Sequence, residues 1–245
     1  WIPDVHYRGG NTRRGTPGHA HNKLVMINPN SETKTQLIYG SGNLSTGTVL
    51  HHENWHFVTT SPKSYFAQVH QCLREGLLNH GALRNTYKDY ILECRSKIEV
   101  AEEEDIKVFL IPGDGAKAHT YLKKGVETAE VLSMAAHRFS HKKLREWLSL
   151  RLENDPSVEV RLIADDDIYW SGQEGQSVGS NTRSEASRIN KMSKRGLEVQ
   201  YMETNHDQGL LHHNKFLIFD DVRKGKNGVF TGAGNLTGAA FSKNY

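Results

Sequence analysis

The segment HNKFLIFD, at residues 213–220, combines a polar start with a run of apolar residues. The run from Phe216 to Phe219 has the length and residue types of a buried β-strand. Side chains alternate between the two faces of a strand, so His213 and Lys215 are expected to project to the same side. An imidazole and an ammonium group therefore converge at the start of this strand.

The same pattern occurs a second time, 192 residues earlier. The tripeptide HNK stands at residues 21–23 and leads into the apolar run from Leu24 to Ile27. The same offset relates GSGNL at residues 40–44 to GAGNL at residues 232–236. Because two separate motifs keep the same spacing, the sequence predicts an internal repeat.

The rest of the pattern predicts an α/β fold. Strands are expected at residues 2–7, 36–39, 106–111, 158–163, 197–202 and 229–231, and helices at residues 119–136, 141–153 and 184–194. Strands that alternate with helices are typical of an α/β sheet.

The acidic stretch from Glu99 to Asp105 marks the expected boundary between the two copies. We therefore expect two domains, at residues 1–100 and residues 101–245. The first copy has only the strand at residues 2–7 ahead of its HNK segment. With the second copy as the template, the first domain is expected to lack roughly 80 residues at its N-terminal side.

The repeated residue types suit the cleavage of a phosphodiester. The oxygens need a neutralising charge, the phosphorus needs a nucleophile and the leaving oxygen needs a proton. Histidine can supply either of the last two near neutral pH, and lysine supplies the charge. Asn43 and Asn235, each in a glycine-rich turn, have amide donors for the non-bridging oxygens. Each copy therefore contains the parts of half a site.

This combination resembles the signature of the phospholipase D superfamily, in which HxK is followed by four residues, then Asp, and later by a GSxN-type turn. His213, Lys215 and Asp220 match the signature in the second copy. The first copy departs from it, because Asn28 stands at the aspartate position. This change removes no reacting group.

The resemblance implies two homologous α/β domains with mixed sheets, packed pseudo-symmetrically around one shared active site, with the first domain incomplete at its N-terminus. It implies a phosphodiesterase in which His21 and His213 face each other across the interface. One histidine forms a phosphohistidine intermediate and the other protonates the leaving group. Because the N-terminal histidine is usually the nucleophile in this superfamily, His21 is assigned that role.

The resemblance also assigns the remaining site residues. The groups that would bind phosphate are Lys23, Lys215, Asn43, Asn235 and Ser41. Asp220 would support the site structurally, and Glu53, which follows the first glycine-rich turn, would orient a histidine. The corresponding step in the second copy reaches Tyr245, the last residue. The resemblance implies no metal and no other cofactor.

The sequence allows two other interpretations. The 14 histidines suggest a zinc site, but the extra histidines His19 and His212 do not recur in the other copy. A closed set of four ligands is therefore not evident, and no metal is expected. A non-catalytic phosphate-binding relative is the second interpretation. The intact histidine and lysine of both copies argue against it.

The substrate is expected to be a nucleic acid, either DNA or RNA, rather than a phospholipid. The loops near the motifs are polar and basic, and they show few apolar clusters for contact with a lipid interface. The basic residues of these loops are Arg13, Arg14, Arg223, Lys224 and Lys226. A phospholipase D acting on lipid head groups stays the alternative. With both half-sites on one chain, a monomer suffices and no obligatory protein partner is expected.

Composition sets wider limits. The net charge is +3, and no apolar run reaches the roughly 18 residues that span a bilayer, so a soluble protein is expected. Cys72 and Cys94 both stand in segments that are expected to be helical, which permits one disulfide and leaves the redox compartment open. Localisation also stays open. Secretion or periplasmic export is compatible with a chain that begins within its first domain.

Overall fold

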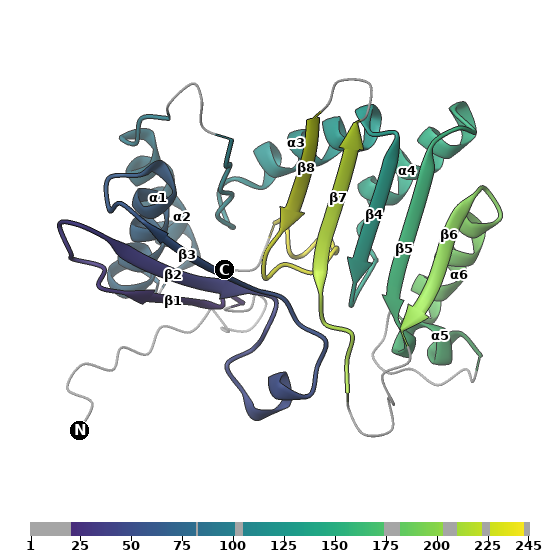
Figure 1. The fold of residues 1–245 in the computed structure, drawn as a ribbon, viewed down its shortest axis with the longest axis horizontal. Helices are drawn as coiled ribbons and strands as arrows, with labels where there is room; N and C mark the ends of the chain where they lie inside the picture. Colours follow the sequence, from purple (N-terminus) through teal and green to yellow (C-terminus); the bar gives the residue numbers. More distant parts are fainter. Residues whose placement is uncertain are drawn as a thin grey trace. The chain divides into compact units, whose positions relative to one another are not determined.

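A computed structural model describes residues 21–81, 83–100, 105–173, 182–202, 210–221 and 226–242. The chain divides into two compact units (Figure 1). Unit 1 comprises residues 1–38, 56–118 and 239–245, and unit 2 comprises residues 39–55 and 119–238. The expected strand at residues 2–7 and the basic residues Arg13, Arg14, Arg223 and Lys224 lie outside the described residues.

Unit 2 is built on a five-stranded mixed sheet with the order β6-β5-β4-β7-β8. Its strands are β4 (Val131–Ala136), β5 (Glu159–Asp165), β6 (Leu197–Met202), β7 (Lys215–Asp221) and β8 (Lys226–Thr231). β4 and β6 each pair in parallel with β5, whereas β7 runs antiparallel to both β4 and β8. The strand that follows the second HNK therefore lies inside the sheet, with a neighbour on each side.

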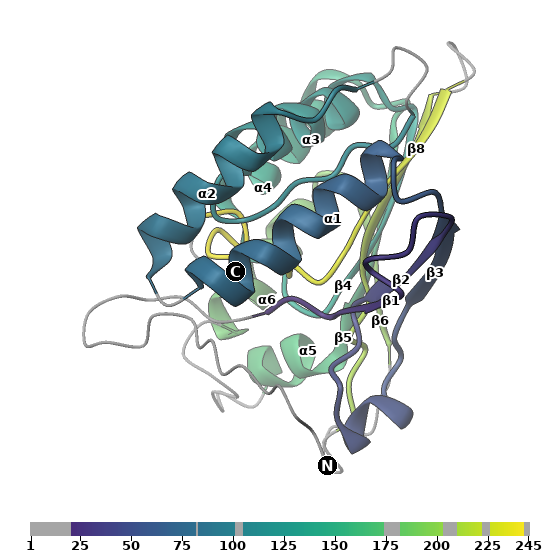
Figure 2. The same cartoon turned by 90° about the vertical axis from the view of Figure 1, so that its left-hand side faces the viewer.

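Helices cover one face of this sheet. Figure 2 shows α3 (Gly115–Thr128), α4 (Lys142–Asn154) and α6 (Thr182–Ser193) on the same side of it. Alternate residues of β5 are buried, among them Val160 and Leu162. Helix α4 buries Leu144, Leu148 and Leu152, which recur every four residues. This spacing places the three leucines on one stripe of the helix, so a single apolar face is buried.

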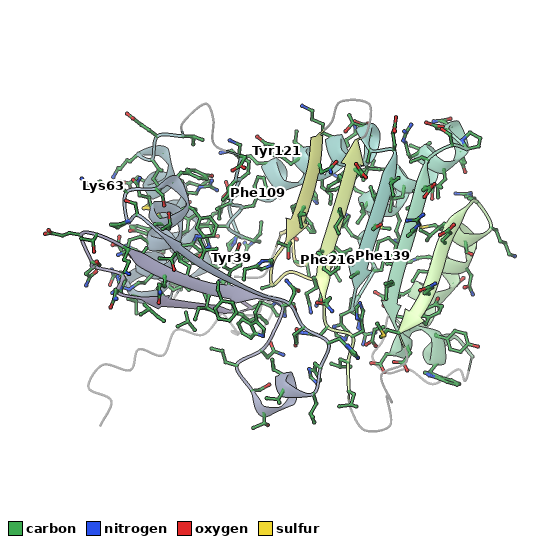
Figure 3. All side chains as sticks on the ribbon, viewed as in Figure 1. Tyr39, Lys63, Phe109, Tyr121, Phe139 and Phe216 are labelled. Carbon is green, nitrogen blue, oxygen red and sulfur yellow. A yellow bond between two sulfur atoms is a disulfide. The ribbon has the colours of Figure 1, made fainter. Side chains whose placement is uncertain are left out.

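The segment after β4 anchors the second glycine-rich turn. The N–H groups of Ser140 and His141 donate to the carbonyl of Leu236 at 3.0 and 2.9 Å. Phe139, labelled in Figure 3, and Leu236 are both buried. The turn that carries Asn235 is therefore fixed to the core directly after the asparagine.

The structure corrects the helix expected at residues 119–136. Helix α3 ends at Thr128, and residues 131–136 form the strand β4. Leu132 and Met134 are buried, and their neighbours across the ladder are residues of β7. The apolar residues at 131–136 are compatible with a helix and with a strand, and they form a strand because they pair with β5 and β7.

The strand expected at residues 106–111 is also wrong. Residues 105–110 have no regular secondary structure. Leu110 and Val108 belong to the hydrophobic core of unit 1, and the N–H of Leu110 donates to Oδ2 of Asp114 at 3.0 Å. Leu110 is therefore buried in the core of unit 1, whereas Ile106, at the start of the run, is 42% exposed, and the run does not extend a sheet.

Other expected elements of the second copy are confirmed. The strands expected at residues 158–163 and 197–202 correspond to β5 and β6, and the helices at residues 141–153 and 184–194 correspond to α4 and α6. Their ends differ from the expectation by two residues or fewer. Strong periodicity within a single element was enough to place them.

Unit 1 combines a three-stranded sheet with two long helices. The sheet has the order β1-β2-β3, and the elements are β1 (Leu24–Ile27), β2 (Thr35–Gly40), β3 (Trp55–Thr60), α1 (Tyr65–Glu75), η2 (Gly76–His80) and α2 (Arg84–Ser96). Val69, Tyr87 and Ile91 are fully buried in its core. A disulfide between Cys72 and Cys94 joins α1 to α2. Among the described residues, no helix combines the length and apolarity needed to cross a membrane.

Candidate active site

The loop between β2 and β3 lies against the HNK segment that begins β7. This loop, residues 41–54, contains one short helix, η1 (Thr46–Val49). The N–H of His52 donates to the carbonyl of Leu211 at 2.9 Å, and the N–H of His213 donates to the carbonyl of His52 at 2.9 Å. Both segments belong to unit 2, so these bonds hold the loop and the start of β7 together within it.

Glu53 holds the imidazole of His213. Nδ1 of His213 lies 2.9 Å from Oε1 and 3.0 Å from Oε2 of Glu53, and both side chains are buried. The hydroxyl of Ser41 donates to Oε2 of Glu53 at 2.6 Å. Burial raises the pKa of the Glu53 carboxyl, but the hydrogen bonds from His213 and Ser41 oppose it, and the net pKa is lowered. An ionised carboxylate at Nδ1 keeps the proton on that nitrogen and leaves Nε2 for chemistry.

The lysines of the two HNK segments make the same local contact. Nζ of Lys23 donates to the carbonyl of His21 at 2.8 Å, and Nζ of Lys215 donates to the carbonyl of His213. Both side chains are buried, with 8% of Lys23 and 2% of Lys215 exposed. Each ammonium group is therefore held beside the histidine of its own segment, where water screens its charge weakly.

The two glycine-rich turns require glycine for different reasons. A Cβ atom at Gly42 would lie 2.5 Å from the ring of Trp55, so only glycine fits there. Gly232 has a φ of +151°, which other residues rarely adopt. The turns present Asn43, which is exposed, and Asn235, which is half-buried.

Two further histidines lie close to the pair of Glu53 and His213. The ring centroid of His137 lies 4.9 Å from that of His213. Nδ1 of His51 lies 3.7 Å from Oε1 of Glu53. His51 is close to Glu53 in the sequence, whereas no local pattern marks His137, whose position at the end of β4 depends on the sheet.

Asp165, at the end of β5, is fully buried and contacts two backbone groups. Its Oδ2 accepts the N–H of His212 at 2.6 Å, and its Oδ1 accepts the N–H of Asp167 at 3.1 Å. Burial, followed by the nearby charges of Asp167 and Asp166, raises the pKa of Asp165 to about 7. A usable signal was present in the sequence, because functional groups gather where parallel strands end.

Burial keeps the neighbouring imidazoles neutral. Burial, and then the charges of Lys215 and Arg138, lower the pKa of His137 to about 2. Burial, and then the charge of His52, lower the pKa of His212 to about 4. At neutral pH both rings are therefore uncharged, and they can act as hydrogen-bonding groups but not as phosphate-binding charges.

One known protein family matches the part of the chain that contains His213. The family described as "Cardiolipin synthase, PLD-like domain" matches residues 120–245, just over half of the chain. The chain belongs to the phospholipase D superfamily. The matched residues include His213, Lys215, Asp220 and Asn235. A search of curated proteins finds no match.

Several solved structures resemble this superfamily member. Phosphatidylserine synthase from Haemophilus influenzae Rd KW20 is 14% identical, with a TM-score of 0.55, and the match covers 93% of this chain and 56% of that one. NucT from Helicobacter pylori is 20% identical, with a TM-score of 0.41, over 56% of this chain and 78% of that one. Nuc from Salmonella typhimurium, a phospholipase D family member, is 21% identical, with a TM-score of 0.38, over 52% and 70%. The likeness to the synthase shows a shared fold.

The residues expected from the superfamily signature fall into both units. Ser41, Asn43, Glu53, His213, Lys215, Asp220 and Asn235 lie in unit 2, whereas His21 and Lys23 lie in unit 1. The facing of His21 and His213, and the pseudo-symmetric packing of two domains, stay predictions. Asp220 pairs with Val131 and lies roughly 17 Å along β7 from Lys215. Its expected support of the site would therefore act through the strand.

One group of side chains near the site has donor atoms that could hold a cation. One atom each of His137, Asp165 and Asp167 lies within 4.8 Å of the other two. Both oxygens of Asp165 already accept backbone N–H groups, and Asp167 lies 3.8 Å from Arg138. Helix α5 (Asp166–Gln173) begins here, and its N-terminal N–H groups favour carboxylates without any metal. We therefore interpret the group as a helix start and not as a metal centre.

Proposed function

We propose that this superfamily member is a phosphodiesterase that cleaves its substrate through a phosphohistidine intermediate. The observation that carries the proposal is the buried pair of Glu53 and His213, joined at 2.9 and 3.0 Å through Nδ1. A carboxylate at this nitrogen fixes the ring and stabilises its protonated form. Membership of the superfamily supports the reaction class.

The proposed reaction has two steps. In the first, neutral His21 attacks phosphorus and forms an N–P bond, while the P–O bond of the leaving group breaks and His213 gives its proton to that oxygen. In the second, water attacks phosphorus, His213 takes a proton from the water, and the N–P bond breaks. The proton donor is assigned to His213 because Glu53 favours the protonated ring.

The substrate phosphate is bound by groups from both HNK segments and both glycine-rich turns. These groups are Lys23, Lys215, Asn43 and Asn235. Lys215 is the most buried of them, and its charge therefore acts strongly on a phosphate in the site. Ser41 acts through Glu53, because its hydroxyl donates to that carboxylate. The histidines and lysines replace the carboxylate clusters of metal-dependent nucleases, so no metal takes part.

We propose a nucleic acid, DNA or RNA, as the substrate, and a monomer as the active form. A nucleic acid offers one phosphodiester for each nucleotide, and the chain has a positive formal net charge of +3. The loops near the motifs are polar. These features support binding to a polyanion.

One observation favours phospholipid as a second candidate. The loop between β2 and β3 exposes Leu44, Val49 and Leu50, with 73%, 85% and 66% of their surfaces accessible. No Asp, Glu, Lys or Arg stands between residues 41 and 52. A segment without these charged residues and with exposed aliphatic side chains is suited to contact with a lipid surface.

A side-by-side assay of single-stranded DNA, duplex DNA, RNA and phospholipid vesicles tests these proposals. We expect the wild-type protein to cleave a nucleic acid, and the His213→Asn variant to bind the same substrate without cleaving it. Turnover of vesicles alone would replace nucleic acid with phospholipid as the substrate. Binding of every substrate without turnover by the wild-type protein would favour a non-catalytic relative.

A further inference from the structure

The backbone just before His213 is held along both of its edges. On one edge, the N–H of His52 donates to the carbonyl of Leu211, and the N–H of His213 donates to the carbonyl of His52, each at 2.9 Å. On the other edge, the N–H of His212 donates to Oδ2 of Asp165 at 2.6 Å. Successive N–H groups of an extended chain point to opposite sides, so the N–H of His212 faces away from the loop.

No strand among the described residues accepts the N–H of His212. The neighbouring strand β4 ends at Ala136, and the next backbone contact on this edge is from the N–H of His137 to the carbonyl of Asn214 at 3.3 Å. His212 is only 3% exposed, so water has little access to it. A buried backbone N–H needs an acceptor, and the carboxylate of Asp165 supplies it where the sheet does not.

Asp165 does more than begin a helix. Its Oδ1 accepts the N–H of Asp167 in the first turn of α5, and this single bond is enough for a helix cap. Its Oδ2 is directed instead to His212. The carboxylate therefore connects the start of α5 to the residue directly before His213.

We propose that Asp165 is a positioning residue for His213, acting through the backbone of His212 and not through contact with substrate. The inference rests on the proposed function, in which His213 exchanges a proton with the leaving oxygen. Glu53 fixes the ring of His213 through Nδ1, and Asp165 fixes the backbone from which the ring projects. Proton transfer needs a heavy-atom separation of about 2.6–3.2 Å, so a small displacement of this backbone lowers its rate.

The Asp165→Asn variant tests the proposal with little change in side-chain volume. Its amide oxygen can replace one carboxylate oxygen, but its NH2 group then opposes the second backbone N–H. We expect kcat to fall by about tenfold, the kinetic equivalent of one lost hydrogen bond, with KM nearly unchanged. We also expect faster amide exchange at His212 and a shifted ¹⁵N signal from the ring of His213.

The Asp114→Asn variant is the matched control. Asp114 is also a buried carboxylate, 1% exposed, that accepts a backbone N–H, from Leu110 at 3.0 Å, and it lies in unit 1. We expect this change to lower Tm. We do not expect it to alter the ring signal of His213 or the kcat of the folded protein.

Unchanged amide exchange at His212 and an unchanged ring signal of His213 in Asp165→Asn, with kcat within about twofold of wild type, would overturn the proposal. If this variant is too unstable to purify, Asp165→Glu provides the same readings, because its longer side chain displaces the acceptor while keeping a carboxyl group. A wild-type protein that cleaves no phosphodiester would refute the proposed function. In that case the exchange and ring measurements still decide whether Asp165 positions His213.

Discussion

The two HNK segments contain the same three residues in different surroundings. The second segment begins β7, inside a five-stranded sheet, and Lys215 is 2% exposed. The first segment leads into β1, an edge strand of four residues of which none is fully buried, and Lys23 is 8% exposed. The same tripeptide therefore occupies an interior position in one sheet and an edge position in the other.

The residue at the aspartate position of the signature also differs between the two copies: Asn28 in the first and Asp220 in the second. Asn28 has a φ of +54° and accepts the N–H of Ser31 in a tight turn, whereas Asp220 continues the ladder of β7. Asparagine tolerates the left-handed conformation better than most residues. The difference shows that the aspartate of the signature can be replaced where the local turn favours asparagine. The histidine and lysine, in contrast, are the same in both copies.

Removal of either histidine is expected to have the largest effect on kcat, and it tests most directly whether the two HNK segments have different roles. We expect His21→Asn and His213→Asn each to lower kcat by about 10³-fold or more. With an activated ester whose leaving group needs no proton, His213→Asn should still form a covalent phosphohistidine, and His21→Asn should not. Mass spectrometry after an alkaline quench measures this species. The opposite pattern would exchange the roles of the two histidines.

Glu53→Gln should have the next largest effect, because it removes the charge that distinguishes the second histidine. We expect kcat to fall by roughly 100-fold. The carboxylate favours protonated His213, so its loss should move the alkaline limb of the pH–rate profile to lower pH. Ser41→Ala is the matched control, since it removes one hydrogen bond to Glu53 and leaves the charge in place. A limb that stays fixed or moves to higher pH would contradict the assigned role.

The same pair has a consequence for stability at low pH. The pKa of Glu53 is lowered in the folded protein, so its stabilising contribution is present above the usual carboxyl value of 4.5. That contribution is lost as pH falls from 4.5 through the lower pKa of the folded state. The Tm difference between wild type and Glu53→Gln should therefore be constant above this window and shrink within it.

Loss of the disulfide is expected to act on unit 1, the unit of the first HNK segment. The bond joins residues that are 22 positions apart in the sequence. In the chain-entropy treatment, closing a loop of this size stabilises the folded state by about 3 kcal/mol. Thermal unfolding of the Cys72→Ala and Cys94→Ala double variant measures this effect. A Tm equal to that of wild type under oxidising conditions would contradict it.

Substitutions in the loop between β2 and β3 are expected to have a smaller effect, and they test whether the substrate is a nucleic acid or a phospholipid. We expect replacement of Leu44, Val49 and Leu50 by serine to weaken vesicle binding by roughly tenfold, because three aliphatic side chains no longer leave water. Turnover of a nucleic acid should change little. Val229→Ser, another exposed residue of unit 2 at 65%, is the control. Equal losses on both substrates would show that the loop serves the site and not a lipid surface.

Removal of divalent ions should have the smallest effect. Both half-sites use histidine, lysine and asparagine, so we expect turnover in EDTA to stay within about twofold of the untreated protein. A loss of activity in EDTA that a divalent ion restores would contradict this and would draw attention to His137, Asp165 and Asp167.

Local sequence patterns were sufficient for features that depend on neighbouring residues. The HNK spacing located β1 and β7, and the apolar period of α4 located that helix. The pattern could not distinguish helix from strand in β4, because the choice depends on the pairing of Leu132 and Met134 with β7. The same is true of the disulfide, which depends on how α1 packs against α2.

The partner of Glu53 could not be read from the sequence either. The superfamily pattern indicates that Glu53 contacts a histidine. Which histidine it contacts depends on the backbone hydrogen bond between His52 and Leu211, which are far apart in the chain. Asp165 presents the same difficulty. Its contact with His212 arises from the point at which β4 ends beside β7, and no local spacing encodes that point.

The backbone hydrogen bond between His52 and Leu211 also limits how the chain can be divided into two active fragments. A cut near residue 100 would leave the segment from His213 to Lys215 on one fragment and Glu53 on the other. The C-terminal fragment would keep all five strands of its sheet and lose the carboxylate on Nδ1 of its histidine. Activity from two separately produced fragments would then require complementation, with the loop of one inserted beside β7 of the other.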